Sequence, residues 1–219
     1  RQFSVGIGTA ISNVAEWGAF NMTYIIATWI SLAANSVYGY SVQVMGLCFM
    51  FYLGIGSATS VRVAEAFGSG NRDAVRDAGR LGVAATIVMG IILALVLILF
   101  NGPISTIMVR SDAVLNGVVL APAIASLLVI AAAMTIFDGL QATSSMALRA
   151  QEIIWTPSVL HVGSFVFVMI PACYWLGLVE GRGAQGMMEG GLIGVGTAGI
   201  VQTLFLELKA ARLPNRRAA

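Results

Sequence analysis

Two acidic residues, Glu16 and Asp138, interrupt long apolar stretches of the sequence. An ionised group at the centre of a membrane costs about 3 kcal/mol or more, so acids in such stretches usually serve a function. Asn13 and Asn21 flank Glu16, while Gln141 follows Asp138 by about one helical turn. A pair of carboxylates in a poorly solvated cavity can alternate between protonated, cation-bound and substrate-bound states. We therefore expect cation-coupled transport chemistry at these two acids.

Further polar and aromatic side chains accompany the two acids. Trp17 and Tyr38 could form aromatic walls that hold an organic cation by cation–π attraction. Ser144 belongs to a polar run that follows Asp138. The candidate substrate or cavity residues are Asn13, Trp17, Asn21, Tyr38, Gln141 and Ser144. If the coupling ion is Na⁺ and not H⁺, Glu16 and Asp138 are its expected ligands, and no other metal or cofactor is predicted.

A purely structural role is the alternative for each acid. Each could stay protonated and hydrogen-bond across helices, or pair with a cation supplied by another part of the protein. Along ideal helices, Glu16 lies ~22 Å from Arg1, and Asp138 lies ~16 Å from Arg149. If both arginines lie at one membrane face, the two acids approach the same level near mid-membrane. No Lys or Arg is predicted at that depth, which favours a mobile cation.

The composition predicts an integral membrane protein. Of 219 residues, 58% are hydrophobic and only 10% are charged, whereas soluble domains carry roughly 25% charge. The mean hydropathy is +0.88. These values exclude soluble, disordered, collagen-like and disulfide-scaffold classes, and a net charge of +2 does not suggest nucleic-acid binding. Because the chain begins with Arg1 and not with Met, we interpret it as part of a longer protein.

Charge-free windows predict six membrane-spanning helices, since one crossing needs roughly 20 apolar residues. The apolar runs are continuous and do not alternate, which favours helices over barrel strands. The expected fold is an all-α six-helix membrane bundle forming a single domain, residues 1–219. The predicted helices cover residues 5–30, 35–63, 76–100, 113–150, 153–178 and 186–210.

The distribution of Lys and Arg predicts the orientation of the bundle. Ten of the twelve fall on one side of the predicted bundle, and only Arg110 and Arg182 fall on the other. This bias predicts that both ends of the chain face the cytoplasm. The membrane that the bundle spans is expected to be a cell inner membrane. Arg149 and the loop arginines are interpreted as orientation signals or headgroup contacts. The ten are Arg1, Arg62, Arg72, Arg76, Arg80, Arg149, Lys209, Arg212, Arg216 and Arg217.

Three other features are given structural interpretations. Glu189 begins the last predicted helix and is interpreted as a solvated acid at a helix start. His161, the only histidine, is interpreted as a hydrogen-bonded residue near the cytoplasmic interface. A repeat of small residues every four positions predicts close packing of the last helix. The repeat consists of Gly186, Gly190, Gly194 and Ala198.

Three segments together resemble the multidrug and toxic compound extrusion (MATE) family of transporters. The first is the glycine-containing run of residues 54–70, which is followed by an arginine-bearing connection. The second is Phe137-Asp-Gly-Leu-Gln141 with Ala147-Leu-Arg149 after it. The third is Gly183-Ala-Gln-Gly186, which leads into a glycine-rich last helix. These segments span nearly the whole chain in the order that the family has.

The resemblance implies a larger transporter. Family members consist of two six-helix lobes, twelve helices in all, related by pseudo-twofold symmetry, and this chain resembles the carboxy-terminal lobe. The amino-terminal lobe of the same protein and the lipid bilayer are then its partners. In the bacterial branch that resembles sodium-driven exporters, an acid in the lobe's first helix and an aspartate in its fourth form the cation-coupling site. These positions match Glu16 and Asp138.

The implied function is antiport and not enzyme catalysis. Inward flow of Na⁺ or H⁺ would drive export of small organic cations or drugs by alternating access. The chain departs from the family at Gly186-Met-Met-Glu-Gly190, where relatives often carry an aromatic residue. The alternatives are a lipid-linked oligosaccharide flippase, which is expected to carry arginines in its cavity, and an ion channel, whose repeated filter is not visible.

Overall fold

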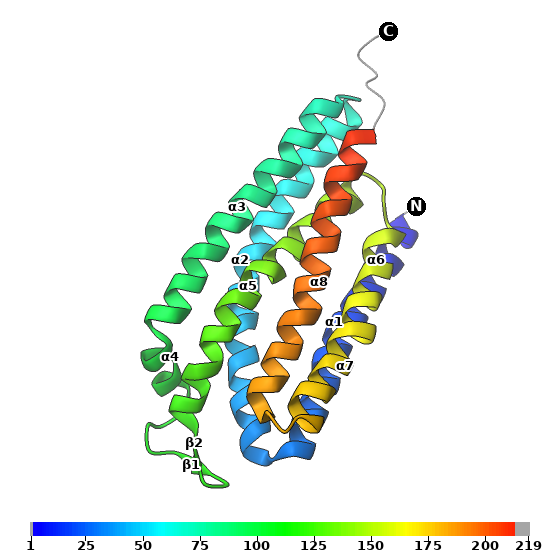
Figure 1. The fold of residues 1–219 in the computed structure, drawn as a ribbon. Coiled ribbons are helices and arrows are strands. Elements are labelled where there is room, and N and C mark those ends of the chain that lie inside the picture. Colours follow the sequence, from blue (N-terminus) through cyan, green and yellow to red (C-terminus); the bar gives the residue numbers. More distant parts are fainter. Residues whose placement is uncertain (1, 213–219) are drawn as a thin grey trace.

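Six long helical rods lie side by side in the computed structural model (Figure 1). The structure describes the backbone of residues 2–212 and the side chains of residues 6–209. Five of the rods are single helices: α1 (Gln2–Ile30), α2 (Leu32–Gly68), α3 (Arg72–Leu99), α5 (Leu120–Ala150) and α8 (Gly183–Arg212). The remaining rod joins α6 (Trp155–His161), η1 (Val162–Met169), α7 (Ile170–Cys173) and η2 (Tyr174–Val179).

The predicted all-α membrane fold is confirmed. Among the described residues, five rods are long and apolar enough to cross a membrane: Leu32–Gly68, Arg72–Leu99, Leu120–Ala150, Trp155–Val179 and Gly183–Lys209. Helix α1 has 29 residues, which is also long enough for a crossing. Asn13, Glu16 and Asn21 lie along it.

Helix α5 is the centre of the bundle. It packs against α2, α3 and α8, while α1 packs against α2 and the rod formed by α6 to η2. Because neighbours surround α5, its polar residues are shielded from lipid, and those from Asp138 to Ser145 are nearly all buried. Buried polar groups need partners, so this segment of α5 is where the fold concentrates polar contacts.

The largest difference from the predicted helices lies before α5. A helix was expected from residue 113, but a short helix, α4 (Asn101–Met108), and a β-hairpin precede Leu120. In the hairpin, β1 (Val114–Leu115) pairs with β2 (Val118–Val119) in antiparallel register. Asn116 and Gly117 have φ angles of 48° and 78°, the left-handed conformation that a two-residue hairpin turn requires. The Asn-Gly pair was the signal in the sequence.

The predicted close packing of the last helix is confirmed. A Cβ atom on Gly186 would lie 2.3 Å from the carbonyl oxygen of Leu176, and one on Gly190 would lie 2.5 Å from the backbone nitrogen of Cys173. Both obstructing atoms belong to the backbone and cannot rotate away. Glycine is therefore required at both positions for α8 to approach the neighbouring rod.

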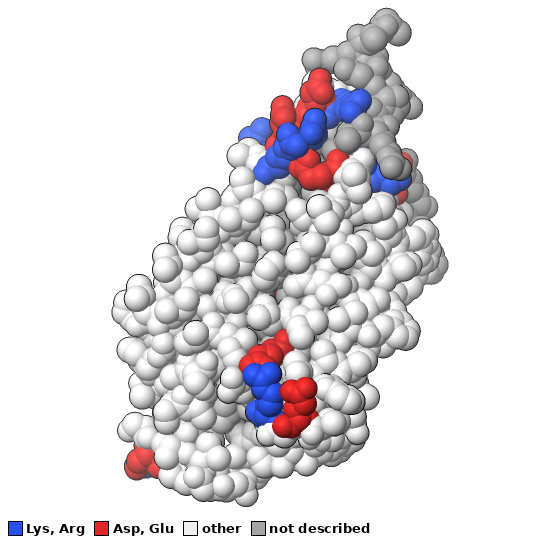
Figure 2. Space-filling view, in the orientation of Figure 1, with Lys and Arg blue, Asp and Glu red and all other residues white. Residues whose placement is uncertain are grey.

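On the face shown in Figure 2, charged side chains gather toward the two ends of the bundle, and the surface of the belt between them is almost free of charge. We call the end near both termini the terminal end and the opposite end the hairpin end (Figure 1). At the terminal end, Arg80 lies 3.0 Å from Glu207, and at the hairpin end Arg110 lies 3.1 Å from Asp112. Three residues used in the orientation prediction lie outside the described residues, as does the side chain of Arg212: Arg1, Arg216 and Arg217.

Candidate functional site

The side-chain amide of Gln141 hydrogen-bonds to both Glu16 on α1 and Asp138 on α5. Nε2 of Gln141 donates to Oδ1 of Asp138 across 3.3 Å and to Oε1 of Glu16 across 3.4 Å. Asp138 and Gln141 share a face of α5 because three residues make about one helical turn. Asp138 is 6% exposed and Gln141 is fully buried. The amide therefore links two carboxyl groups from separate helices within the belt.

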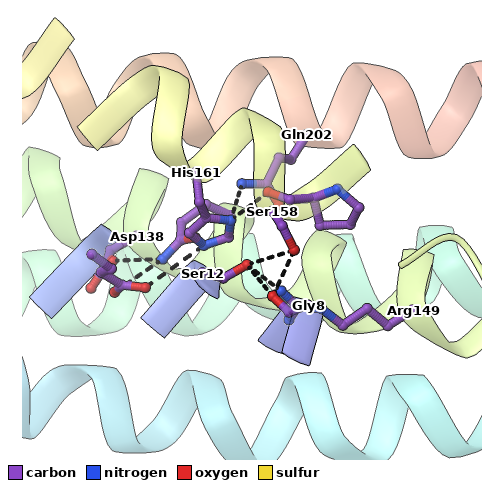
Figure 3. A network of polar contacts seen from close by, with 10 residues as sticks. Gly8, Ser12, Asp138, Arg149, Ser158, His161 and Gln202 are labelled. Carbon is purple, nitrogen blue, oxygen red and sulfur yellow. Dashed lines mark hydrogen bonds and ion pairs between the residues drawn. The ribbon is translucent and has the colours of Figure 1, made fainter. Parts of the chain in front are cut away.

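His161 approaches Glu16 from the other side. Its Nε2 atom lies 3.7 Å from Oε2 of Glu16, and its Nδ1 atom lies 2.8 Å from the carbonyl oxygen of Pro157. The Nε2 atom of Gln202, on α8, lies 3.2 Å from the same Nδ1 atom. Side chains from α1, α5, α6 and α8 thus meet at one place in the bundle (Figure 3).

A second layer of polar contacts lies one turn closer to the terminal end. Ser12 precedes Glu16 by four residues on α1, and Ser158 precedes His161 by three on α6. Oγ of Ser12 lies 3.2 Å from Oγ of Ser158, which donates to the carbonyl oxygen of Gly8 across 2.6 Å (Figure 3). We call Ser12, Glu16, Ser158 and His161 the polar seam between α1 and α6.

Arg149 closes the polar seam at the terminal end. Its Nη2 atom donates to Oγ of Ser12 across 2.6 Å (Figure 3). The interpretation of Arg149 as a headgroup contact is therefore wrong, because its guanidinium points between helices. The expectation that no cation approaches the two acids also needs correction, since Ser12 is one turn from Glu16. The depth predicted from helix spacing applied to the backbone of residue 149. The long side chain of Arg149 extends well beyond that backbone position and reaches Ser12.

A cavity of about 460 Å³ opens beside the two acids between α1 and α2. Glu16 and Asp138 both line it, and its lining contains no Lys or Arg. Aromatic rings from both helices form much of the wall. Together with the amides at its edge, they are Trp17, Phe20, Tyr24, Phe49, Asn21 and Gln43. Acids beside aromatic faces favour a positively charged organic guest.

Some of the predicted cavity residues lie at the cavity, but Tyr38 does not. Trp17 and Asn21 line the cavity, and Gln141 joins the two acids behind it. Tyr38 is fully buried, with its hydroxyl 2.9 Å from Oγ1 of Thr23, so Tyr24 stands in the wall instead. This corrects the placement predicted for Tyr38.

Two more cavity predictions are corrected. Ser144 is buried, and its hydroxyl lies 3.0 Å from Oγ1 of Thr203 on α8, because its position on α5 points away from α1. Asn13 is exposed on α1 and is not part of the lining of this cavity. A polar run in the sequence did not distinguish the faces of α5 that meet different neighbours.

Glu189 lies apart from the two acids, whereas His161 contacts one of them although its interpretation from sequence was only structural. Glu189 forms an ion pair with Arg182 and accepts a hydrogen bond from Nε2 of Gln185 across 3.1 Å. It therefore belongs to the hairpin end. His161, in contrast, is only 3% exposed and faces Glu16, and Gln202 was not predicted at all. The sequence signals were a histidine and a glutamine inside apolar helices.

The fold and the buried acid pair define a helical membrane protein with a polar centre shared by several helices. A family model described as MatE matches residues 9–175, and the chain belongs to this family. The predicted resemblance is thereby confirmed.

The chain is also similar to curated bacterial proteins. The chain is 31% identical over 188 residues to a probable multidrug resistance protein NorM from Caulobacter vibrioides, covering 86% of this chain and 39% of that protein. It is 30% identical over 211 residues to the multidrug resistance protein NorM of Burkholderia vietnamiensis, covering 95% and 46%. The chain thus spans less than half the length of these relatives.

Solved structures share the fold at low sequence identity. An outward-facing multidrug resistance MATE transporter matches with a TM-score of 0.87 and 16% identity, covering 96% of this chain and 46% of that one. An inward-facing conformation matches with a TM-score of 0.84 and 16% identity, covering 97% and 48%. The chain therefore corresponds to one lobe of such structures.

Proposed function

We propose that this lobe belongs to an antiporter that exports organic cations or drugs in exchange for Na⁺ or H⁺. The observation that carries the proposal is that Glu16 and Asp138, which both accept hydrogen bonds from Gln141, lie on the wall of a cavity lined with aromatic rings. One ion exchanged for another requires a site where both compete for the same negative charge, and alternating access then couples their movements. The relatives' designation as multidrug resistance proteins supports this function.

The lining of the cavity favours a cationic cargo. Its two acids are unaccompanied by Lys or Arg in the lining, so an anionic pyrophosphate would meet only like charge. The flippase alternative, which needs cationic side chains in the cavity, is therefore not supported. Trp17 and Tyr24 offer ring faces beside the acids, an arrangement that stabilises flat, positively charged guests.

The coupling ion would bind where the two carboxyl groups meet. Glu16 and Asp138 offer carboxylate oxygens, and Oε1 of Gln141 is buried without a hydrogen-bond partner among the described residues. Hard cations such as Na⁺ prefer oxygen ligands of this kind, while a proton needs only one of the carboxylates. Among the described residues, no cluster of three or more His, Cys, Asp or Glu is arranged to hold a metal ion. A Na⁺ donor set at this place would therefore rest on the carboxylate oxygens of Glu16 and Asp138, because Gln141 turns its amide nitrogen and not its oxygen toward both acids.

The proposed orientation follows from the two ends of the bundle. Ten of the twelve Lys and Arg residues belong to the terminal end by sequence position, so this end faces the cytoplasm of a cell inner membrane. The chain then forms the carboxy-terminal lobe, and the exposed faces of α1 and α2 beside the cavity face the amino-terminal lobe. Substrate would move between the two lobes.

The test uses the complete transporter in proteoliposomes loaded with ethidium. Efflux is driven by a Na⁺ gradient and, in separate vesicles, by a pH gradient. Glu16→Gln and Asp138→Asn should each reduce gradient-driven efflux to the level of protein-free vesicles, because a neutral side chain cannot exchange one cation for another. The gradient that drives wild-type efflux identifies the coupling ion.

Glu207→Gln is the matched control for these variants. Glu207 is an acid on α8 that pairs with Arg80 at the terminal end, and it is not part of the cavity lining. It should retain wild-type efflux. Full gradient-driven efflux in both Glu16→Gln and Asp138→Asn would refute the proposed mechanism.

A further inference from the structure

The ring of His161 is held on three sides. Its Nδ1 edge faces the carbonyl oxygen of Pro157 at 2.8 Å and Gln202 at 3.2 Å. One ring face stacks on Phe165, with centroids 5.7 Å apart and planes inclined by 18°. Phe165 itself is fully buried. Nδ1 hydrogen-bonds to one of these two groups at a time: it donates to Pro157 when it is protonated and accepts from Nε2 of Gln202 when it is not. In the second case the proton lies on Nε2, and the contacts at Nδ1 together with Phe165 leave the imidazole little freedom to rotate.

The free edge of this ring is directed at Glu16. Oε2 of Glu16 lies 3.7 Å from Nε2 of His161, and Oε1 receives the amide of Gln141. The two oxygens of one carboxyl group are thus approached from α6 and from α5. A separation of 3.7 Å is longer than a hydrogen bond, so the ring limits where the carboxylate can turn and does not bind it tightly.

Gln202 extends this arrangement to a fourth helix. It is fully buried on α8, and its Oε1 atom has no hydrogen-bond partner among the described residues. An unpaired buried amide oxygen costs roughly 1 to 3 kcal/mol, whereas leucine would fill a similar volume without that cost. The only described side chain to which Gln202 bonds is His161. Its polarity is thus explained by the ring it holds.

We propose that His161, held by Gln202, is a positioning residue that orients Glu16 for the coupling cation. This inference rests on the proposed function of Glu16 and Asp138. Side chains that hold a cation's ligands in place typically change its affinity about 10- to 100-fold when removed. The pair should therefore set the concentration at which the coupling ion half-saturates transport. It should have a smaller effect on the maximal rate.

The experiment measures ethidium efflux by the complete transporter as the concentration of the coupling ion, Na⁺ or H⁺, is varied. His161→Asn and His161→Gln form the decisive pair. Glutamine can place its amide near the position of Nε2, which faces Glu16, whereas asparagine reaches only the position of Nδ1. His161→Asn should raise the half-saturating concentration about 10- to 100-fold. His161→Gln should raise it less than His161→Asn does, because it keeps an amide facing Glu16 but loses the Nδ1 contact with Gln202. Both variants should keep most of the maximal rate.

Gln202→Leu tests the link to α8. It should raise the half-saturating concentration in the same direction as His161→Asn. The double variant should be no worse than His161→Asn alone, because Gln202 acts through the ring and such effects are not additive. Gln151→Leu is the control, since Gln151 is also a buried amide with an unpaired Oε1, but it bonds to the carbonyl oxygen of Ala147. It should leave the half-saturating concentration unchanged.

The outcomes separate this inference from the proposed function. If Glu16→Gln abolishes coupled efflux but His161→Asn keeps the wild-type half-saturating concentration, the positioning role is wrong and the proposed function stands. Equal effects of His161→Asn and His161→Gln would also overturn it, because only the Nε2 edge faces Glu16. If wild-type efflux responds to neither gradient, the proposed function fails and this inference fails with it.

Discussion

Arg149 on α5 and Ser12 on α1 are joined by a hydrogen bond of 2.6 Å between Nη2 and Oγ. Oγ of Ser12 in turn lies 3.2 Å from Oγ of Ser158 on α6, so the contact ties three helices together. Nε of Arg149 is buried without a hydrogen-bond partner among the described residues. The guanidinium therefore depends on Ser12 for much of its polar contact inside the bundle.

Ser12→Ala should destabilise the protein by about 1.5 to 3 kcal/mol, the usual range for a hydrogen bond to a charged group. The measurement is the thermal unfolding temperature of the purified complete transporter. Ser36→Ala is the control, because Oγ of Ser36 donates only to the carbonyl oxygen of Leu32 in its own helix. A fall of the same size in both variants would show that the Arg149 contact contributes nothing.

Gly190→Ala should lower the amount of folded protein and its unfolding temperature. The new methyl group would lie 2.5 Å from the backbone nitrogen of Cys173, and such overpacking costs about 1 to 3 kcal/mol. Gly196→Ala adds the same methyl group to α8 where no atom lies within 4 Å. That variant should be neutral or slightly more stable, since alanine favours helices. Equal stability of both variants contradicts the close packing of α8.

Trp17→Ala should weaken the transport of aromatic cations. Trp17 is 62% exposed and lines the cavity beside Glu16, and a cation–π contact at an exposed site contributes about 0.5 to 1 kcal/mol. The KM for ethidium should rise about 2- to 5-fold, as that free energy implies. Trp29→Ala removes an equally exposed ring outside the cavity lining and should leave KM unchanged. A shift in both variants would point to a general effect of tryptophan loss.

Glu189→Gln should alter neither the coupling-ion dependence nor the maximal rate of efflux. Glu189 pairs with Arg182 at the hairpin end, where both side chains are partly exposed. Screened pairs of this kind contribute about 0 to 1 kcal/mol, so the unfolding temperature should change little. Loss of coupled efflux in this variant would instead assign Glu189 to the transport machinery.

The sequence predicted the helical rods well because membrane crossings leave a strong physical signal. Lipid demands continuous apolar runs whose backbone is satisfied internally, and those runs are visible residue by residue. The hairpin around Asn116 was missed because Val118 and Val119 continue an apolar pattern into α5. Only the Asn-Gly turn chemistry opposed that interpretation.

The acid pair was accessible from sequence, but its surroundings were not. Glu16 and Asp138 stand out because charge is rare within the spans, and helix lengths place them at similar depths. Which face of each helix meets which neighbour depends on packing, so Tyr38 was predicted in a wall that Tyr24 occupies. Gln202 is separated from His161 by 41 residues, and a single sequence gives no measure of that contact.

The hairpin provides a place to attach a spectroscopic reporter. Cys48 and Cys173, the two cysteines in this chain, are both buried as free thiols. A cysteine introduced at Asn116 would stand at a turn outside the helical rods and react first with a maleimide dye. Single-molecule fluorescence between that dye and a second label would then time, in lipid vesicles, the conformational change that the proposed alternating access requires.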